Sequence, residues 1–138
     1  MELDKALTFA RDHRQAVLTT IRSNGRPQLS NVLYVVFDDG LIRISITTDR
    51  AKYRNLTREP WAALHISRQD FFAYVVLEGE VELSPVATRP DDATADELVE
   101  YYRAGSGEHE DWDAYRQSMV DDHRVMVRLT PTRAYGML

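Results

Sequence analysis

Apolar side chains recur at helical spacing at the start of the chain. Leu3, Ala6, Leu7 and Ala10 fall on one side of a helix that turns once every ~3.6 residues. This spacing predicts a short amphipathic helix over residues 2 to 13.

The pattern then changes to the alternation that is typical of half-buried strands. Residues 15 to 21 (QAVLTTI) form the first predicted strand, and Ser23-Asn24-Gly25 is a good turn signal. Residues 26 to 37 (RPQLSNVLYVVF) continue as a long second strand, whose apolar density indicates burial partly on both sides. A further turn at residues 38–40 leads into a third strand over residues 41 to 47.

A helix and two more strands follow. Residues 49 to 59 are good helix formers that Pro60 brings to an end. Strands are predicted over residues 61 to 67 and 73 to 84, joined by the connection RQDFF at 68–72. Short turns between so many consecutive strands favour an antiparallel meander or barrel, because parallel neighbours need long crossovers.

The last third of the chain mixes helices with one strand. Pro85 and Pro90 interrupt the strand pattern, and helices are predicted over residues 91 to 104 and 111 to 120. A final strand is predicted over residues 123 to 131. We expect a mainly β protein with α (α+β), with about six antiparallel strands and three or four helices in a single domain over residues 1–138.

Charge is unevenly distributed along the chain. The formal net charge is -5, yet residues 91 to 122 hold eleven Asp or Glu against Arg103 and Arg116, a local balance of -9. The remainder is therefore +4, from -5 minus -9. A broad basic face interleaved with aromatic residues is missing, so we expect a discrete anionic ligand rather than nucleic acid.

Composition and terminal sequence indicate the compartment. The chain contains no cysteine, which excludes disulfides and thiolate metal sites and makes a reducing cytoplasm the simplest location. Its start is charged, and no apolar run approaches the ~20 residues of a membrane span. We expect a cytoplasmic protein without a membrane partner.

Several common catalytic patterns are absent. The four histidines show no metal-ligand spacing, and neither a GxSxG elbow nor a GxGxxG fingerprint occurs. Gly105-Ser106-Gly107 is not followed by the Lys-Ser/Thr of a phosphate loop, so a linker is the better interpretation. We expect no metal site and nominate no catalytic acid.

One cationic corner remains, at the start of the helix predicted over residues 49 to 59. Arg50, Lys52, Arg54 and Arg58 lie in this stretch, although a helix N-terminus favours anions over cations. A bound anion would resolve the misfit, and Arg50 and Lys52 are nearest to the N-terminus. Arg54 and Arg58 are expected to pair with acids or face solvent.

A polar insertion marks the second strand. Gln28, Ser30 and Asn31 interrupt an otherwise apolar run. They form either a polar outer face or an edge that meets the carbonyl and N–H groups of a planar heterocycle.

Four segments also resemble a known family. GRPQLSNVLYVVF, DRAKYRNLTREPWAALHI, YVVLEGEVELSP and GEHEDWDAYRQSMVDDHRVMVRLTPTRAYG are similar to the actinobacterial split β-barrel proteins of the pyridoxamine-phosphate-oxidase-like superfamily that use the deazaflavin coenzyme F420. The likeness runs from about Gln15 to Gly136. It implies an FMN-binding-like split β-barrel and a homodimer, with F420 at the subunit interface and hydride transfer between its C5 and a small organic acceptor.

The resemblance also implies which residues contact the cofactor. Arg50 and Lys52 match the pair that holds the cofactor phosphate, and relatives often have Trp at the position of Phe72, which reaches across from the other subunit. The remaining implied contacts are Gln28, Leu29, Ser30, Asn31, Ser45, Ile46 and Asn55.

The resulting hypothesis is an F420-dependent reductase. Two alternatives stay open: an FMN-dependent oxidase of the same fold, because FMN also carries a phosphate, and a non-catalytic carrier of flavin or F420. The chain ends before the carboxy-terminal segment expected of a true pyridoxamine phosphate oxidase, which weakens the hypothesis that the protein oxidises the vitamin.

Overall fold

The computed structural model describes residues 1–138 and contains four helices and seven strands. The helices are α1 (Leu3–Arg11), α2 (Ala51–Arg58), α3 (Ala93–Ser106) and α4 (Trp112–Asp121). The strands are β1 (Gln15–Ile21), β2 (Pro27–Leu33), β3 (Val35–Val36), β4 (Ile42–Thr47), β5 (Trp61–Ser67), β6 (Tyr74–Leu83) and β7 (Arg124–Met137).

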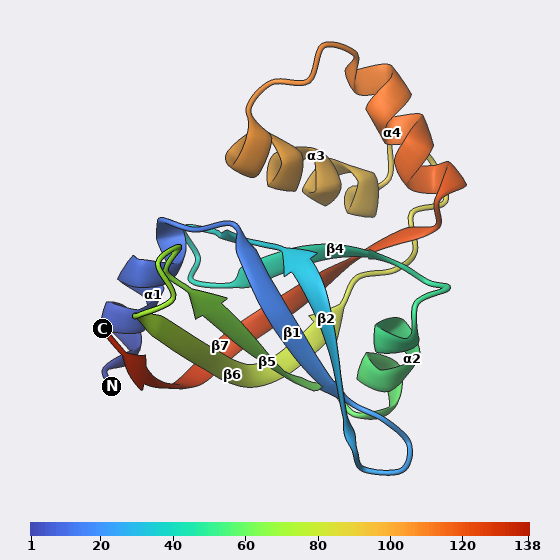
Figure 1. Ribbon diagram of the computed structural model, residues 1–138. Coiled ribbons are helices and arrows are strands. Elements are labelled where there is room, and N and C mark those ends of the chain that lie inside the picture. The colour runs from blue at the N-terminus through green and yellow to red at the C-terminus, as the bar shows by residue number, and fades with distance from the viewer.

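All seven strands form one antiparallel sheet in the order β2-β1-β5-β6-β7-β4-β3. Figure 1 shows the sheet curling on itself, with α2 beside one end and α3–α4 beyond β4. The expectation of an antiparallel barrel is confirmed, but a simple meander is wrong, because β1 pairs with β5 and β4 with β7. No ladder joins β2 to β4, so the barrel is split between them.

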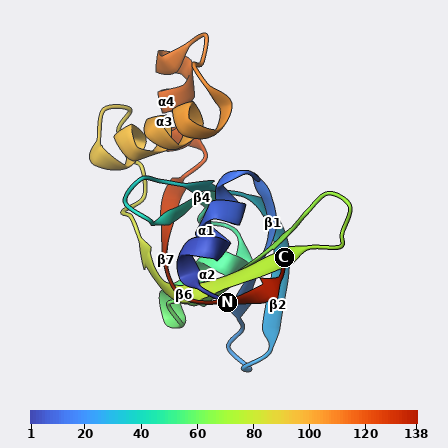
Figure 2. The same ribbon diagram turned by 90° about the vertical axis from the view of Figure 1, so that its left-hand side faces the viewer.

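Alternation along the strands fills the barrel interior. β1 buries Ala16, Leu18 and Thr20 and turns Val17 and Thr19 outward. The other long strands repeat the pattern, and α1 closes one end of the barrel with Ala6, Leu7 and Ala10. Both chain termini lie near α1, as Figure 2 shows.

The strand predicted over residues 26 to 37 is in fact two strands. It breaks at Tyr34, whose N–H donates to the Arg14 carbonyl and whose buried hydroxyl donates to the Ala10 carbonyl. Burial of this stretch on both sides is also wrong for β2, in which every residue is exposed or half-buried. β2 is an edge strand, so no neighbour covers its free side.

α3 and α4 form a second, smaller core against the outer side of the sheet. Leu98, Tyr101 and Met119 pack there with Val35 and Met126. Asp92 and Asp111 cap the two helices through their side chains. The linker interpretation of residues 105–107 is wrong for Gly105 and Ser106, which form the last turn of α3; Gly107, with a positive φ of 83°, caps the helix.

A cluster of charges ties α3 to the sheet. The Glu97 carboxylate accepts from Arg43 on β4 at 2.8 Å and from Arg128 on β7 at 2.8 and 2.6 Å. Only 13% of the Glu97 side chain is exposed.

No helix in the structure is long and apolar enough to span a membrane.

Candidate cofactor-binding groove

The first turn of α2 lies at the split in the barrel. Arg50 is its N-cap residue with extended backbone (φ −81°, ψ 146°), and no side chain caps the helix. The first turn contains no acidic residue. The nearest carboxylate, that of Asp49, accepts from the Thr47 hydroxyl and does not cap the helix, so α2 has no side-chain acceptor for its free N–H groups.

A cavity of about 310 Å³ opens at this helix end, and we call it the cationic groove. Its residues come from β2, β4, α2 and β7, which are far apart in sequence. They are Ser30, Asn31, Ser45, Ile46, Thr47, Arg50, Lys52 and Arg124. No carboxylate lines the groove, so its three cations leave it strongly positive.

Lys52 shows the electrostatic character of the groove. Its ammonium group donates to the Ser30 hydroxyl at 3.3 Å and forms no ion pair. Burial, and then the positive charges of Arg50 and Arg124, lower the pKa of Lys52 below its usual value. A bound anion would relieve this repulsion.

Arg124 is the third cation, and sequence reasoning missed it. Its Nη1 lies 3.4 Å from the Ser45 carbonyl oxygen and 3.3 Å from the Ser45 hydroxyl, and its buried Nε has no hydrogen-bond partner. Asp122 approaches that Nε only to 3.8 Å. The pairing of Arg124 with Thr47 across β7 and β4 brings it to the groove. No local pattern signals this long-range pairing.

The two strand edges at the split have free backbone groups. The Tyr34 N–H donates to the Arg14 carbonyl just beyond the β1–β2 ladder. In the regular antiparallel register, the backbone N–H and C=O groups of the even-numbered residues of β2 therefore point toward β1. The N–H and C=O groups of Leu29 and Asn31 therefore point to the open side.

The same alternation applies to β4. The Thr48 N–H donates to the His123 carbonyl, which fixes the hydrogen-bonded pairs of the β4–β7 ladder. Backbone groups of Ser45 and Thr47 consequently point away from β7, toward the split. The Ser45 carbonyl already accepts from Arg124 and the Thr47 carbonyl from the Arg50 N–H, so the β4 edge offers its N–H donors while the β2 edge offers both donors and acceptors to a polar planar group.

Six of the ten residues implied by the resemblance line this groove together: Ser30, Asn31, Ser45, Ile46, Arg50 and Lys52. The side chain of Ile46 belongs to the barrel core and its backbone groups point toward β7, so Ile46 offers no polar group to the groove.

Gln28 and Asn55 lie instead in a network under α2. Buried Asn55 donates from Nδ2 to Gln28 Oε1 at 2.7 Å and to Thr20 Oγ1 at 3.1 Å. Arg58 donates to Asn55 Oδ1 at 3.2 Å and to the Ile21 carbonyl at 2.8 Å. This network holds β2 against α2, and the expectation that Arg58 pairs with an acid or faces solvent is incomplete.

Leu29 and Phe72 lie outside the groove of their own chain. Leu29 is 61% exposed on the outer face of β2, and Phe72 is 80% exposed in the connection after β5. Phe71, in the same connection, has a positive φ of 71°. Both phenylalanines project from the sheet without a covering partner in this chain.

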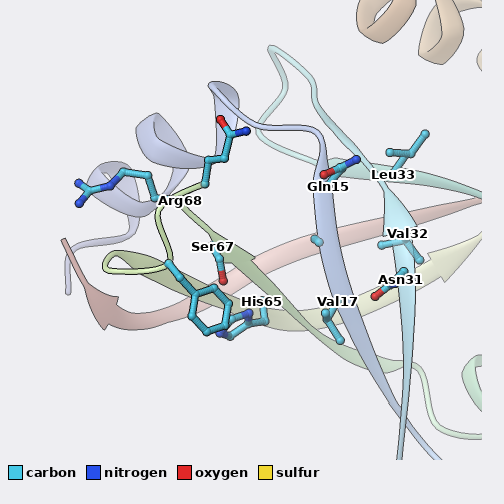
Figure 3. Close-up of a pocket in the computed structure, with 11 residues that line it drawn as sticks. Gln15, Val17, Asn31, Val32, Leu33, His65, Ser67 and Arg68 are labelled. Carbon is cyan, nitrogen blue, oxygen red and sulfur yellow. The ribbon is translucent and has the colours of Figure 1, made fainter.

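A larger cavity of about 560 Å³ lies on the outer face of β2, β1 and β5. Figure 3 shows Val17, Asn31 and His65 from the three strands around it, with Arg68 pointing away. His65 stacks on Tyr74, with ring centroids 5.1 Å apart. Asn31 lines both this cavity and the cationic groove, so the two spaces meet at the β2 edge.

These residues fit a phosphate-bearing cofactor with a planar ring. Three cations and a helix N-terminus suit the phosphate, and the open backbone edges suit the carbonyl and N–H groups of a flavin or deazaflavin ring. The structure contains no group of three or more His, Asp or Glu side chains arranged to hold a metal ion.

Comparisons with known proteins agree with this fold. A model of the family described as pyridoxamine 5'-phosphate oxidase matches residues 3–138. A conserved hypothetical protein of Mycobacterium tuberculosis is 23% identical, with a TM-score of 0.77 over 99% of this chain and 84% of its own. A structure named F420 reductase is 26% identical, with a TM-score of 0.65 over 88% of this chain and 89% of its own.

A third similar structure has a different described role. The heme storage protein HutZ of Vibrio cholerae is 16% identical, with a TM-score of 0.71 over 99% of this chain and 96% of its own. Proteins with this fold therefore differ in what they bind. The match over residues 3–138 nevertheless shows that this chain belongs to the pyridoxamine 5'-phosphate oxidase family.

Proposed function

We propose that this protein is a reductase that uses coenzyme F420 to reduce a small organic acceptor. The observation that carries the proposal is the cationic groove, in which Arg50, Lys52 and Arg124 face two open strand edges without a carboxylate. The 26% identity to a structure named F420 reductase supports F420 as the cofactor.

Each part of the groove has a role in this proposal. Arg50, Lys52 and Arg124, with the N–H groups of α2, hold the phosphate. The Asn31 amide and the free backbone groups of β2 and β4 orient the deazaflavin ring. When bound, the reduced cofactor supplies the hydride, and the protein supplies orientation and restricts water.

We further propose that the protein acts as a homodimer through the outer face of the sheet. Asn31, Val17, His65, Val76 and Tyr135 form one row across five strands of this face. Exposed apolar side chains flank the row, and such a patch is typical of an interface. They are Leu29, Leu33, Phe71, Phe72 and Met137. In the dimer, Phe72 reaches the groove of the partner subunit.

An FMN-dependent oxidase is the second candidate. The same three cations would hold the FMN phosphate, so the groove supports both cofactors. A carrier that binds either cofactor without turnover would use the same contacts.

Parallel titration of the purified protein with F420 and FMN tests the proposal. We expect tighter binding of F420, and repeated turnover of reduced F420 when an acceptor is added, followed by its absorbance. Preferential binding of FMN would favour the oxidase. Tight binding of F420 without turnover across a broad acceptor panel would favour the carrier.

A further inference from the structure

A second space opens directly beside the cationic groove, between the β2 and β4 edges and the α3–α4 pair. Figure 1 shows α3 and α4 over β4. The cavity between these helices and the strand edges has a volume of about 320 Å³. This is near the lower end of the range of roughly 300–1,000 Å³ for small-molecule sites. We call it the side chamber. It shares Asn31, Ser45, Lys52 and Arg124 with the groove, so the two spaces are continuous.

The helical side of the chamber is apolar. Tyr101, Tyr115 and Met119 line it from α3 and α4, and Leu33 lines it from β2. Both phenol groups are already used, because Tyr101 donates to the Leu33 carbonyl at 3.0 Å and Tyr115 to the Leu98 carbonyl at 2.9 Å. Burial raises the pKa of Tyr101 and raises that of Tyr115 to about 12, so both rings stay neutral. This wall offers ring faces and a thioether.

Apart from Val32, the opposite side of the chamber is polar. Lys52 and Arg124 contribute positive charge, and Asn31 and Ser45 contribute an amide and a hydroxyl. No carboxylate lines the chamber. A molecule that satisfies both sides has an apolar body and an oxygen that accepts hydrogen bonds.

The surrounding charge limits that molecule further. The α3–α4 segment at residues 91 to 122 has a balance of -9, from eleven acids and two arginines. Approach past these helices is unfavourable for a multiply charged anion. A single negative charge or a neutral carbonyl suits the chamber better.

We infer that the side chamber binds the acceptor, and that this acceptor is a small molecule with an apolar ring and one anionic or carbonyl oxygen. The ring packs against Tyr101, Tyr115 and Met119, and the oxygen accepts from Asn31 and Ser45, next to Lys52 and Arg124, whose positive charge it shares with the cofactor phosphate. The role of this molecule as acceptor rests on the proposed reductase function. In this reduction the C5–H bond of the reduced deazaflavin would break and its hydride, with both electrons of that bond, would form a new bond to the acceptor. Water would supply the proton that completes the addition, and the proton lost by the oxidised deazaflavin would return to water.

Methyl NMR of methionine-labelled protein tests the binding directly. The chain has four methionines, of which Met119 lines the chamber while Met1 and Met137 are exposed elsewhere. On titration with 2-naphthoate, we expect the Met119 signal to shift and those of Met1 and Met137 to stay in place. Hexanoate, which has the same carboxylate but no ring, should bind at least tenfold more weakly.

Two substitutions at one position provide matched variants. Tyr115→Ala removes the ring from the wall and should raise the Kd for 2-naphthoate at least tenfold. Tyr115→Phe keeps the ring and should leave that Kd within about twofold. If Tyr115→Ala does not fold, Lys52→Ala tests the opposite side of the chamber and should weaken 2-naphthoate more than naphthalene methanol. Equal affinity of 2-naphthoate for all variants, or shifts confined to Met137, would overturn the inference.

Cofactor titrations separate this inference from the proposed function. We expect F420 to bind Tyr115→Ala within a few-fold of its affinity for the unmodified protein, and 2-naphthoate to bind in its presence. Mutually exclusive binding would make the chamber part of the cofactor site and overturn the inference. Binding of 2-naphthoate at Met119 without any binding of F420 would support the ligand class and refute the reductase.

Discussion

Arg50 and Lys52 lie where the electrostatics of the backbone favour the opposite sign. The N-terminal N–H groups of α2 are positive, and no acidic residue in the first turn offsets them. A cation at this end is unfavourable by typically 0.3–1 kcal/mol. The loss of stability therefore comes from the residues that face the groove.

Removing either cation should affect binding and stability in opposite directions. A charge-assisted hydrogen bond is worth about 1.5–3 kcal/mol, so Arg50→Ala or Lys52→Ala should raise the Kd for F420 about ten- to a hundredfold. Without cofactor, the free energy of unfolding of either variant should equal that of the unmodified protein or exceed it by a few tenths of a kcal/mol. Isothermal titration and denaturant unfolding measure the two quantities.

The structure selects the control for this experiment. Arg58 is unsuitable, because it bonds to Asn55 and to the Ile21 carbonyl. Arg54 is exposed on the same helix and outside the groove, so Arg54→Ala should leave the Kd nearly unchanged. Tight F420 binding by both Arg50→Ala and Lys52→Ala would show that the basic corner has a structural role instead.

At the scale of elements, the attachment of α3 depends on one carboxylate. Burial raises the pKa of Glu97, but hydrogen bonds from Arg128 and Arg43 outweigh it and leave the pKa below its ordinary value. Because the folded-state pKa is depressed, this stabilisation is present above the unfolded pKa of about 4.5 and is lost as pH falls below it.

Glu97→Gln should therefore destabilise the protein in a pH-dependent way. We expect a loss of about 1–3 kcal/mol at pH 7, because two partly buried arginines lose a charged partner but keep Asp39 and Glu82. The difference from the unmodified protein should shrink below pH 4.5. Urea unfolding at pH 7 and pH 4 measures it, and a pH-independent difference would argue against the ionic attachment.

A glycine permits the close contact between β6 and β7. A Cβ atom at Gly79 would lie 1.9 Å from the Thr130 carbonyl oxygen, beside the register shift at Glu78 and Gly79. Gly79→Ala should thus cost at least about 2 kcal/mol of stability, measured by thermal unfolding. Gly25→Ala, in an open turn with nothing within 4 Å, should cost only about 1 kcal/mol for its positive φ. Equal effects would contradict the close-contact explanation.

Local patterns predicted elements well and their long-range pairing poorly. β1 and β5 have the predicted bounds because alternation and flanking turns define them within the sequence itself. The break at Tyr34 depends on contacts with Ala10 and Arg14, and Arg124 reaches the groove through β4–β7 pairing. Such contacts join distant residues, so periodicity contains no information about them.

At the scale of the whole molecule, the exposed apolar side chains of the sheet indicate assembly. Sedimentation at micromolar concentration should give twice the chain mass of 15.9 kDa. Burying the outer face supplies the driving force. A single monomeric species at this concentration would remove the shared-groove proposal.

Phe72 tests the assembly at one position. If it contacts the cofactor of the partner subunit, Phe72→Ala should weaken F420 binding by about 1–3 kcal/mol in an intact dimer. Its high exposure in the single chain means that folding should be unaffected. Unchanged affinity in an intact dimer would assign Phe72 to the interface alone.

The split in the barrel also has a consequence for aggregation. An unpaired strand edge such as β2 can accept a strand from another molecule, which is a common first step of aggregation. Beside this edge, Arg50, Lys52 and Arg124 form no hydrogen bond to a carboxylate, and an incoming apolar strand would have to desolvate them. The cations therefore protect the open edge in the free protein, and a cofactor bound between β2 and β4 would take over that protection.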